Sequence, residues 1–213
     1  QLALRCVSAP FGKPFSYKKV SNHTLAVFIG GHNWKNDKAS TYFVRVKHII
    51  MHPDFPEFNL TKGFDFALLK LQRAVERSQQ VSFACLPKAG FKFGRGNVCH
   101  IAGWGLIPNP PKKLSQTQAE VLMEKPARIA LTSNCQYHHP EVEEDKHVCV
   151  RQDSGTSCAG DGGGALNCVT MEGIWLLYGV ATYVDRVCDK KHFVTVSTSS
   201  ALTWIKETIQ KYN

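Results

Sequence analysis

Short runs rich in β-branched and aromatic residues recur along this chain, separated by turn-forming residues. Partial alternation of apolar and polar positions predicts strands over 25–29 and 41–50. Further strands are expected in the second half, at 97–105, 119–123, 175–183 and 193–197. Many short strands with turn signals between them predict an all-β protein, either a barrel or a sandwich.

Only the last segment has a good helical period. Ser199 and Ser200 provide hydroxyls that can cap a helix, so we expect a helix over 199–213. The apolar positions that would pack one face of it are Leu202, Ile205, Ile209 and Tyr212. Turn-forming residues over 87–96 predict a connector between two halves of the chain.

One apolar run carries a charge. Residues 64–71 are short enough for a buried strand, but Asp65 lies inside the run. A buried carboxylate is costly unless it has a partner. Asp65 is therefore a candidate for either a function or a structural ion pair.

The composition is that of an ordinary globular protein. The chain has 213 residues, of which 43% are hydrophobic and 20% charged. No apolar run approaches the roughly 20 residues needed to cross a bilayer, so no transmembrane helix is expected. The opening residues, 1–6, lack the basic-then-apolar layout of a signal peptide, which is expected of a mature or trimmed product.

The cysteines and two sequons favour the secretory route. Eight cysteines lie far apart, with no Cys-x-x-Cys pair of the kind used for zinc or redox chemistry. Asn22-His23-Thr24 and Asn59-Leu60-Thr61 are acceptable N-glycosylation sequons. Together they predict an extracellular protein with disulfide bonds and glycans at Asn22 and Asn59.

The chain is basic, with a formal net charge of +9. Such a charge either serves solubility or attracts anionic partners such as sulfated glycans or lipid surfaces. Nucleic-acid binding is not expected, because basic and aromatic residues do not interleave. Residues 137–147 gather ligand-type side chains in one loop, as exposed polar loops often do, and we expect no metal and no cofactor.

The glycine-rich stretch Ser157-Cys158-Ala159-Gly160-Asp161-Gly162-Gly163-Gly164-Ala165-Leu166 resembles the nucleophile loop of trypsin-like serine proteases, Ser-Cys-x-Gly-Asp-Ser-Gly-Gly-Pro-Leu. Residues 3–6, 64–69 and 102–105 resemble three further family motifs, in the family's order. The resemblance spans the whole chain. It implies two packed six-stranded antiparallel β-barrels with an active site in the cleft between them.

The resemblance also implies how the chain is divided. Residues 1–87 correspond to the N-terminal barrel, 97–198 to the C-terminal barrel and 199–213 to the final helix. Family members have strands before the segment that residues 3–6 resemble. We therefore expect residues 1–213 to be a family domain that lacks its first strands.

The catalytic positions implied by the resemblance are degenerate. Asp65 stands at the position of the carboxylate, Arg5 at that of the histidine base and Gly162 at that of the serine nucleophile. An arginine stays protonated and cannot accept a proton, and glycine has no side chain to attack a carbonyl. The chain is therefore expected not to be an enzyme, with Arg5 and Thr182 contacting Asp65 instead.

The resemblance also implies an oxyanion hole that is kept and a specificity pocket that is filled. The backbone amides of Gly160 and Gly162 correspond to the oxyanion hole. The specificity pocket corresponds to Thr156 at its base and to Val184 and Phe193 on its walls, where bulky side chains should fill it.

The resemblance also implies a disulfide pattern. The pairs implied are Cys99–Cys168, Cys135–Cys149 and Cys158–Cys188. Cys6 and Cys85 have no intrachain partner in this pattern. Cys85 corresponds to the cysteine that ties some relatives to an upstream chain or domain.

The sequence thus predicts a secreted, non-catalytic serine protease homologue that binds protein, as a cofactor, decoy or regulator of a proteolytic or immune cascade. One alternative is a basic protein that binds glycans or membrane surfaces, which salt-sensitive retention on heparin would indicate. Another is a residual hydrolase that uses a different hydroxyl, such as that of Ser154 or Ser157. Fluorophosphonate labelling would identify it.

Overall fold

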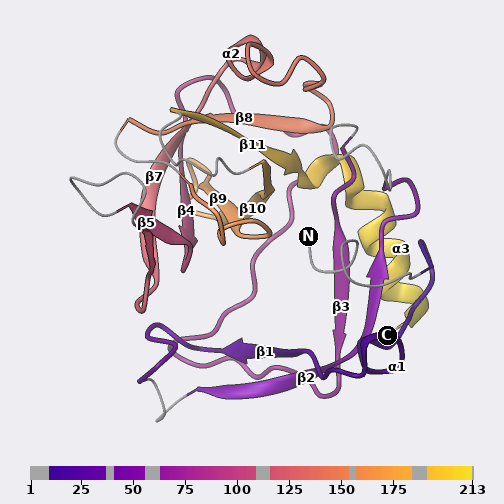
Figure 1. Cartoon of the computed structure of the whole chain (residues 1–213). Coiled ribbons are helices and arrows are strands. Elements are labelled where there is room, and N and C mark those ends of the chain that lie inside the picture. Colours follow the sequence, from indigo (N-terminus) through magenta and orange to yellow (C-terminus); the bar gives the residue numbers. More distant parts are fainter. Residues whose placement is uncertain are drawn as a thin grey trace.

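The computed structural model describes residues 10–36, 41–55, 63–108, 116–153, 157–183 and 191–212. It is an all-β structure with a short N-terminal helix, another short helix in the second half and a longer helix at the end (Figure 1). The strands are β1 (Ala26–Ile29), β2 (Tyr42–Met51), β3 (Ala67–Leu71), β4 (Val98–Gly103), β5 (Leu106–Pro108), β6 (Gln116–Gln118), β7 (Met123–Ile129), β8 (His147–Arg151), β9 (Ala165–Val169), β10 (Trp175–Tyr183) and β11 (His192–Ser197). The helices are α1 (Tyr17–Ser21), α2 (Thr132–Gln136), the 3₁₀ turn η2 (Thr198–Ala201) and α3 (Leu202–Tyr212).

The second half forms a closed antiparallel barrel of six strands, in the order β10-β11-β8-β7-β4-β9. Its interior is filled by side chains that alternate inward along these strands, as a small barrel requires. The buried residues of this core are Cys99, Ile101, Ala127, Ile129, Val148, Val150, Leu166, Cys168, Tyr178, Ala181 and Phe193.

The first half forms an open antiparallel sheet among the described residues, in the order β1-β2-β3. Phe15, Ile49 and Met51 bury a small core beside α1. The backbone of Phe15 extends this sheet by exchanging hydrogen bonds with Ile49, at 3.0 and 2.9 Å. The expected all-β fold is confirmed, with a closed six-stranded barrel, a second sheet region and a C-terminal helix.

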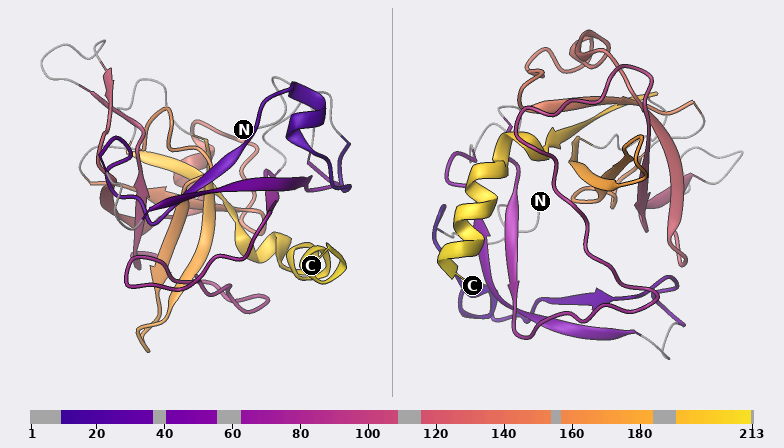
Figure 2. Two further views of the ribbon diagram at one scale, coloured as in Figure 1. Left: turned by 90° about the horizontal axis from the view of Figure 1, so that it is seen from below. Right: turned by 180° about the vertical axis from the view of Figure 1, so that it is seen from behind.

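The final helix joins the two parts. Ile205 of α3 packs with Phe66 from the first half and Val196 from the barrel, and α3 lies beside β3 in opposite views (Figures 1 and 2). Leu202 and Ile205 are buried as expected, whereas Ile209 is half exposed. None of the helices in the described ranges has the length and apolar content to cross a bilayer.

One expected strand lies elsewhere. Most of the segment 119–123 lies outside the barrel, and its backbone bonds to the loop at 32–34. Leu122 N–H donates to the His32 carbonyl at 2.7 Å and Trp34 N–H to the Glu120 carbonyl at 3.1 Å. The barrel strand is β7, which follows and contains Pro126. A proline inside an apolar run argues against a central strand, so the sequence pattern did not predict β7.

Candidate functional site

Asp65 follows an unusual backbone turn just before β3. Phe64 has a φ of 59°, which is rare for a large side chain and costs conformational energy. Its ring stacks on the buried His52 at 4.6 Å between centroids, and His52 N–H donates to the Phe66 carbonyl at 2.9 Å. Packing on His52 thus holds the turn that aims Asp65.

The carboxylate of Asp65 meets the second half of the chain. Thr182 Oγ1, near the end of β10, donates a hydrogen bond to Asp65 Oδ2 at 2.7 Å. This is the contact that the sequence led us to expect for Thr182. The other expected partner, Arg5, lies outside the described residues.

The same strand holds the glycine-rich loop. Ala181, next to Thr182, accepts a hydrogen bond from Gly163 N–H at 2.8 Å and donates one to the Gly164 carbonyl at 2.9 Å. Gly162 is therefore held in an exposed turn beside this point of β10. Residues 181 and 182 thus bring together the loop that contains Gly162 and the carboxylate of Asp65.

Asp161 fixes the loop from within. Its Oδ1 accepts the N–H of Gly105 and its Oδ2 the N–H of Cys158, both at 2.9 Å. A Cβ at Gly103 would lie 2.1 Å from Asp161 Oδ1, and one at Gly105 would lie 2.5 Å from three carboxylate atoms. Glycine at both positions therefore gives this carboxylate its space.

Two backbone amides of the loop have no hydrogen-bond acceptor among the described residues. The Ala159 carbonyl accepts a hydrogen bond from Leu106 N–H at 2.9 Å. Because a trans peptide is planar, the Gly160 N–H points to the opposite side. Within the described residues neither Gly160 N–H nor Gly162 N–H donates a hydrogen bond. Both glycines line a pocket of ≈ 550 Å³ that could receive a polar group.

Only one residue of the expected specificity pocket lies in the described part of the chain. Thr156 and Val184 lie outside the described residues. Phe193 is 3% exposed and packs in the core of the closed barrel. Strand side chains alternate, and the next residue, Val194, instead packs under α2 with Cys135. Phe193 therefore packs inside the barrel, and the occlusion of the specificity pocket by Phe193 stays a prediction.

The described cysteines follow the expected pattern. Disulfides join Cys99 to Cys168 and Cys135 to Cys149. Cys158 is disulfide-bonded, and its expected partner, Cys188, lies outside the described residues, as does Cys6. Cys85 is a free, exposed thiol.

Two other site predictions fall on the surface. Asn22 of the first sequon is exposed at the end of α1, and Asn59 of the second lies outside the described residues. Within the described ranges no three His, Cys, Asp or Glu side chains gather where they could hold a metal ion.

Burial of His52 makes stability depend on pH. Burial lowers the pKa of His52 from its ordinary value of 6.5, opposed by the attraction of Asp54. The unfolded chain then takes up the proton first, so His52 contributes fully above pH 6.5 and its contribution is lost as pH falls from there through the folded-state pKa. We expect the free energy of unfolding in urea to fall over this range, and to fall less in His52→Phe. An equal dependence of the free energy of unfolding on pH in the wild-type protein and in His52→Phe would contradict this.

The comparisons agree with this architecture. The trypsin family profile matches residues 16–205. Chymotrypsin-like elastase family member 1 of Rattus norvegicus is 31% identical over 193 residues, covering 89% of this chain and 71% of the relative. The Homo sapiens protein of that name is 30% identical, covering 87% and 72%.

The fold has a close counterpart among solved structures. A chain described as "Structure of GrC" superposes with a TM-score of 0.74 at 24% identity, over 88% of this chain and 78% of the other. On the family profile and the relatives, with the barrel and the loop at 157–166, the chain belongs to the trypsin family of serine protease homologues.

Proposed function

We propose that this chain does not hydrolyse peptide bonds and acts outside the cell by binding protein, as a cofactor, decoy or regulator of a proteolytic or immune cascade. The observation that carries the proposal is Gly162, a residue with no side chain, in the turn held beside Thr182 and Asp65. Covalent attack on a peptide needs a nucleophilic side chain at that place.

The surroundings of Gly162 support a binding role. The loop keeps its hydrogen bonds to Asp161. The N–H groups of Gly160 and Gly162 have no acceptor among the described residues, so they can donate to a carbonyl or carboxylate of a partner without a reaction. Asp65 accepts a hydrogen bond from Thr182. If Arg5 stands at the position of the base, its guanidinium cannot take up a proton at physiological pH.

A substitute nucleophile has little support. Ser157 is 3% exposed, so a substrate carbonyl could not reach its hydroxyl without local unfolding. Ser154 lies outside the described residues. The name of the relatives, chymotrypsin-like elastase, favours the opposite expectation, that the chain retains hydrolysis. The experiment below decides between the two.

The disulfides and the exposed Asn22 support an extracellular location.

Cys85 offers a place for a covalent partner. Its carbonyl accepts a hydrogen bond from Leu177 N–H at 2.8 Å, so the exposed thiol is held against the edge of β10. Phe83, which is 59% exposed, lies two residues away. We propose that an upstream chain or domain attaches here.

We expect the purified protein to show no fluorophosphonate labelling and no hydrolysis of a panel of peptide substrates above the buffer rate. Loss of the nucleophile alone typically costs about 10⁶-fold in turnover. Mass spectrometry of the labelled protein and initial rates are the measurements. Labelling of any serine, abolished by a substitution in the cleft, would overturn the proposal.

Two variants provide the controls. Gly162→Ser alone should remain unlabelled, because a hydroxyl without a neighbouring base is a weak nucleophile. Gly162→Ser combined with Arg5→His should gain labelling if the two positions are correctly assigned. An unlabelled double variant that keeps its thermal midpoint would contradict the assignment of positions.

A further inference from the structure

A surface pocket of ≈ 590 Å³ lies where the chain leaves β3 and passes the start of β2. Only Ala74 among its lining residues lacks a polar side-chain atom. The full lining is Tyr42, Arg73, Ala74, Glu76, Arg77, Ser78 and Gln80.

Both arginines of this pocket rest on aromatic rings. The guanidinium carbon of Arg73 lies 4.9 Å from the centroid of Tyr42, and that of Arg77 lies 4.7 Å from the centroid of Phe83. Stacking on a ring fixes the plane of a guanidinium and leaves the N–H groups at its edge available. The pocket therefore holds two oriented forks of hydrogen-bond donors.

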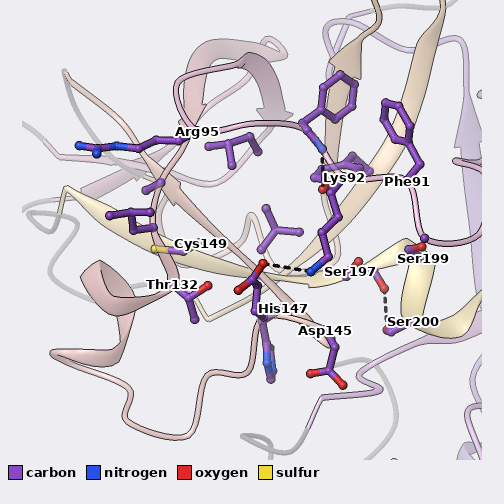
Figure 3. A pocket seen from close by; sticks show the side chains of 18 of the residues that line it. Phe91, Lys92, Arg95, Thr132, Asp145, His147, Cys149, Ser197, Ser199 and Ser200 are labelled. Carbon is purple, nitrogen blue, oxygen red and sulfur yellow. Dashed lines mark hydrogen bonds and ion pairs between the residues drawn. The ribbon is translucent and has the colours of Figure 1, made fainter.

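Neither guanidinium is neutralised by a carboxylate within the described residues. Some other cations on the described surface have carboxylate partners. In the pocket of Figure 3, Lys92 Nζ lies 3.0 Å from Glu144 Oε1. Away from that pocket, Arg151 lies 2.7 Å from Asp153. Glu76 lines the arginine pocket but forms no ion pair with Arg73 or Arg77. Two unpaired, oriented cations around one hollow indicate a site for an oxyanion.

We propose that this pocket binds a sulfate group of an acidic glycan. Planar guanidinium forks match the oxygens of tetrahedral oxyanions, with two parallel hydrogen bonds to each fork. The hydroxyl of Ser78 and the side-chain amide of Gln80 provide donors and acceptors of the kind that bind sugar hydroxyls. A net charge of +9 draws a polyanion towards the chain.

A sulfated peptide fits the lining less well. Its aromatic ring and neighbouring side chains would need apolar surface, and the face of Tyr42 is covered by Arg73. The pocket is also separate from the cleft, because Asp65 precedes β3 and Arg73 follows it. The five residues of that strand span about 16 Å. Glycan binding at this pocket therefore does not depend on whether the chain hydrolyses peptide bonds.

The test is binding of a short heparin oligosaccharide of defined length to the full chain by isothermal titration at physiological salt. Arg73→Gln/Arg77→Gln should weaken binding at least about tenfold, because each charged hydrogen bond lost is worth that factor or more. Glu76→Gln should strengthen binding about two- to fivefold by removing a like charge. The same oligosaccharide without sulfates should not bind.

A matched control separates the pocket from general attraction. Arg45 and Lys47 are exposed on β2 outside the pocket, and Arg45→Gln/Lys47→Gln changes the net charge equally. It should weaken binding less than about threefold. Arg73→Lys/Arg77→Lys keeps the charge but loses the planar fork, so it should also bind weakly, and it covers the case in which the glutamine variant fails to fold.

Equal losses of affinity for the oligosaccharide in the two glutamine double variants would overturn the proposal, since binding would then follow net charge alone. So would binding of a tyrosine-sulfated peptide without binding of the oligosaccharide. Inorganic sulfate in the millimolar range should compete with the oligosaccharide for the wild-type protein. Weaker competition by sulfate in Arg73→Lys/Arg77→Lys would support the site.

Discussion

Replacing Asp161 with alanine is expected to lower the free energy of unfolding by about 3 kcal/mol and to release the loop at 158–164. Its carboxylate accepts two backbone N–H groups, from Gly105 and Cys158, at 2.9 Å each. Both donors lose their partner in the alanine variant, and hydrogen bonds to an ionised group are the stronger kind. Urea denaturation and amide hydrogen exchange at Gly105 and Cys158 are the measurements.

Asp153→Ala is the matched control for this change. Asp153 pairs with Arg128 and Arg151, but its side chain is 54% exposed. Exposed pairs contribute little, so we expect a loss of about 0.5 kcal/mol and no change in exchange within the loop. Gly105→Ala offers an independent route to the same outcome, because its Cβ would displace the Asp161 carboxylate. Unchanged exchange in both Asp161→Ala and Gly105→Ala would show that Asp161 does not hold the loop.

The sequence predicts the fold where local patterns suffice. Residues 41–50 and 175–183 are rich in β-branched and aromatic residues and correspond to β2 and β10. The strand β7 was missed because Pro126 breaks its pattern, and Pro126 lies opposite His100 of β4 in the ladder. Only pairing with distant strands shows that this proline is tolerated there, and no local pattern contains that information.

The candidate site was likewise predictable from the sequence only in part. The family motifs placed Asp65 and Thr182 correctly as partners. They could not indicate that Phe64 has a positive φ, since this depends on the packing of His52. The place of Phe193 in the barrel core depends on register, because one residue decides which side of β11 a side chain faces. Arg73 and Arg77 were not singled out, because their rings, Tyr42 and Phe83, are set by tertiary packing.

Removing the Cys99–Cys168 disulfide, by Cys99→Ala/Cys168→Ala, is expected to cost about 4 kcal/mol of stability. The two residues are paired across β4 and β9 in the barrel core, and both are fully buried. The disulfide closes a loop of 69 residues, so it removes much conformational freedom from the unfolded chain. The midpoint and slope of urea denaturation measure the loss.

The second described disulfide provides the comparison that tests this reasoning. Cys135–Cys149 closes only 14 residues, and its removal by Cys135→Ala/Cys149→Ala should cost about 3 kcal/mol. Cys135 and Cys149 are also buried, so the two pairs differ chiefly in loop length. The longer loop should therefore give the larger loss by about 1 kcal/mol. If the shorter loop gave the larger loss, packing beneath α2, and not the entropy of the unfolded chain, would govern the contribution of these disulfides.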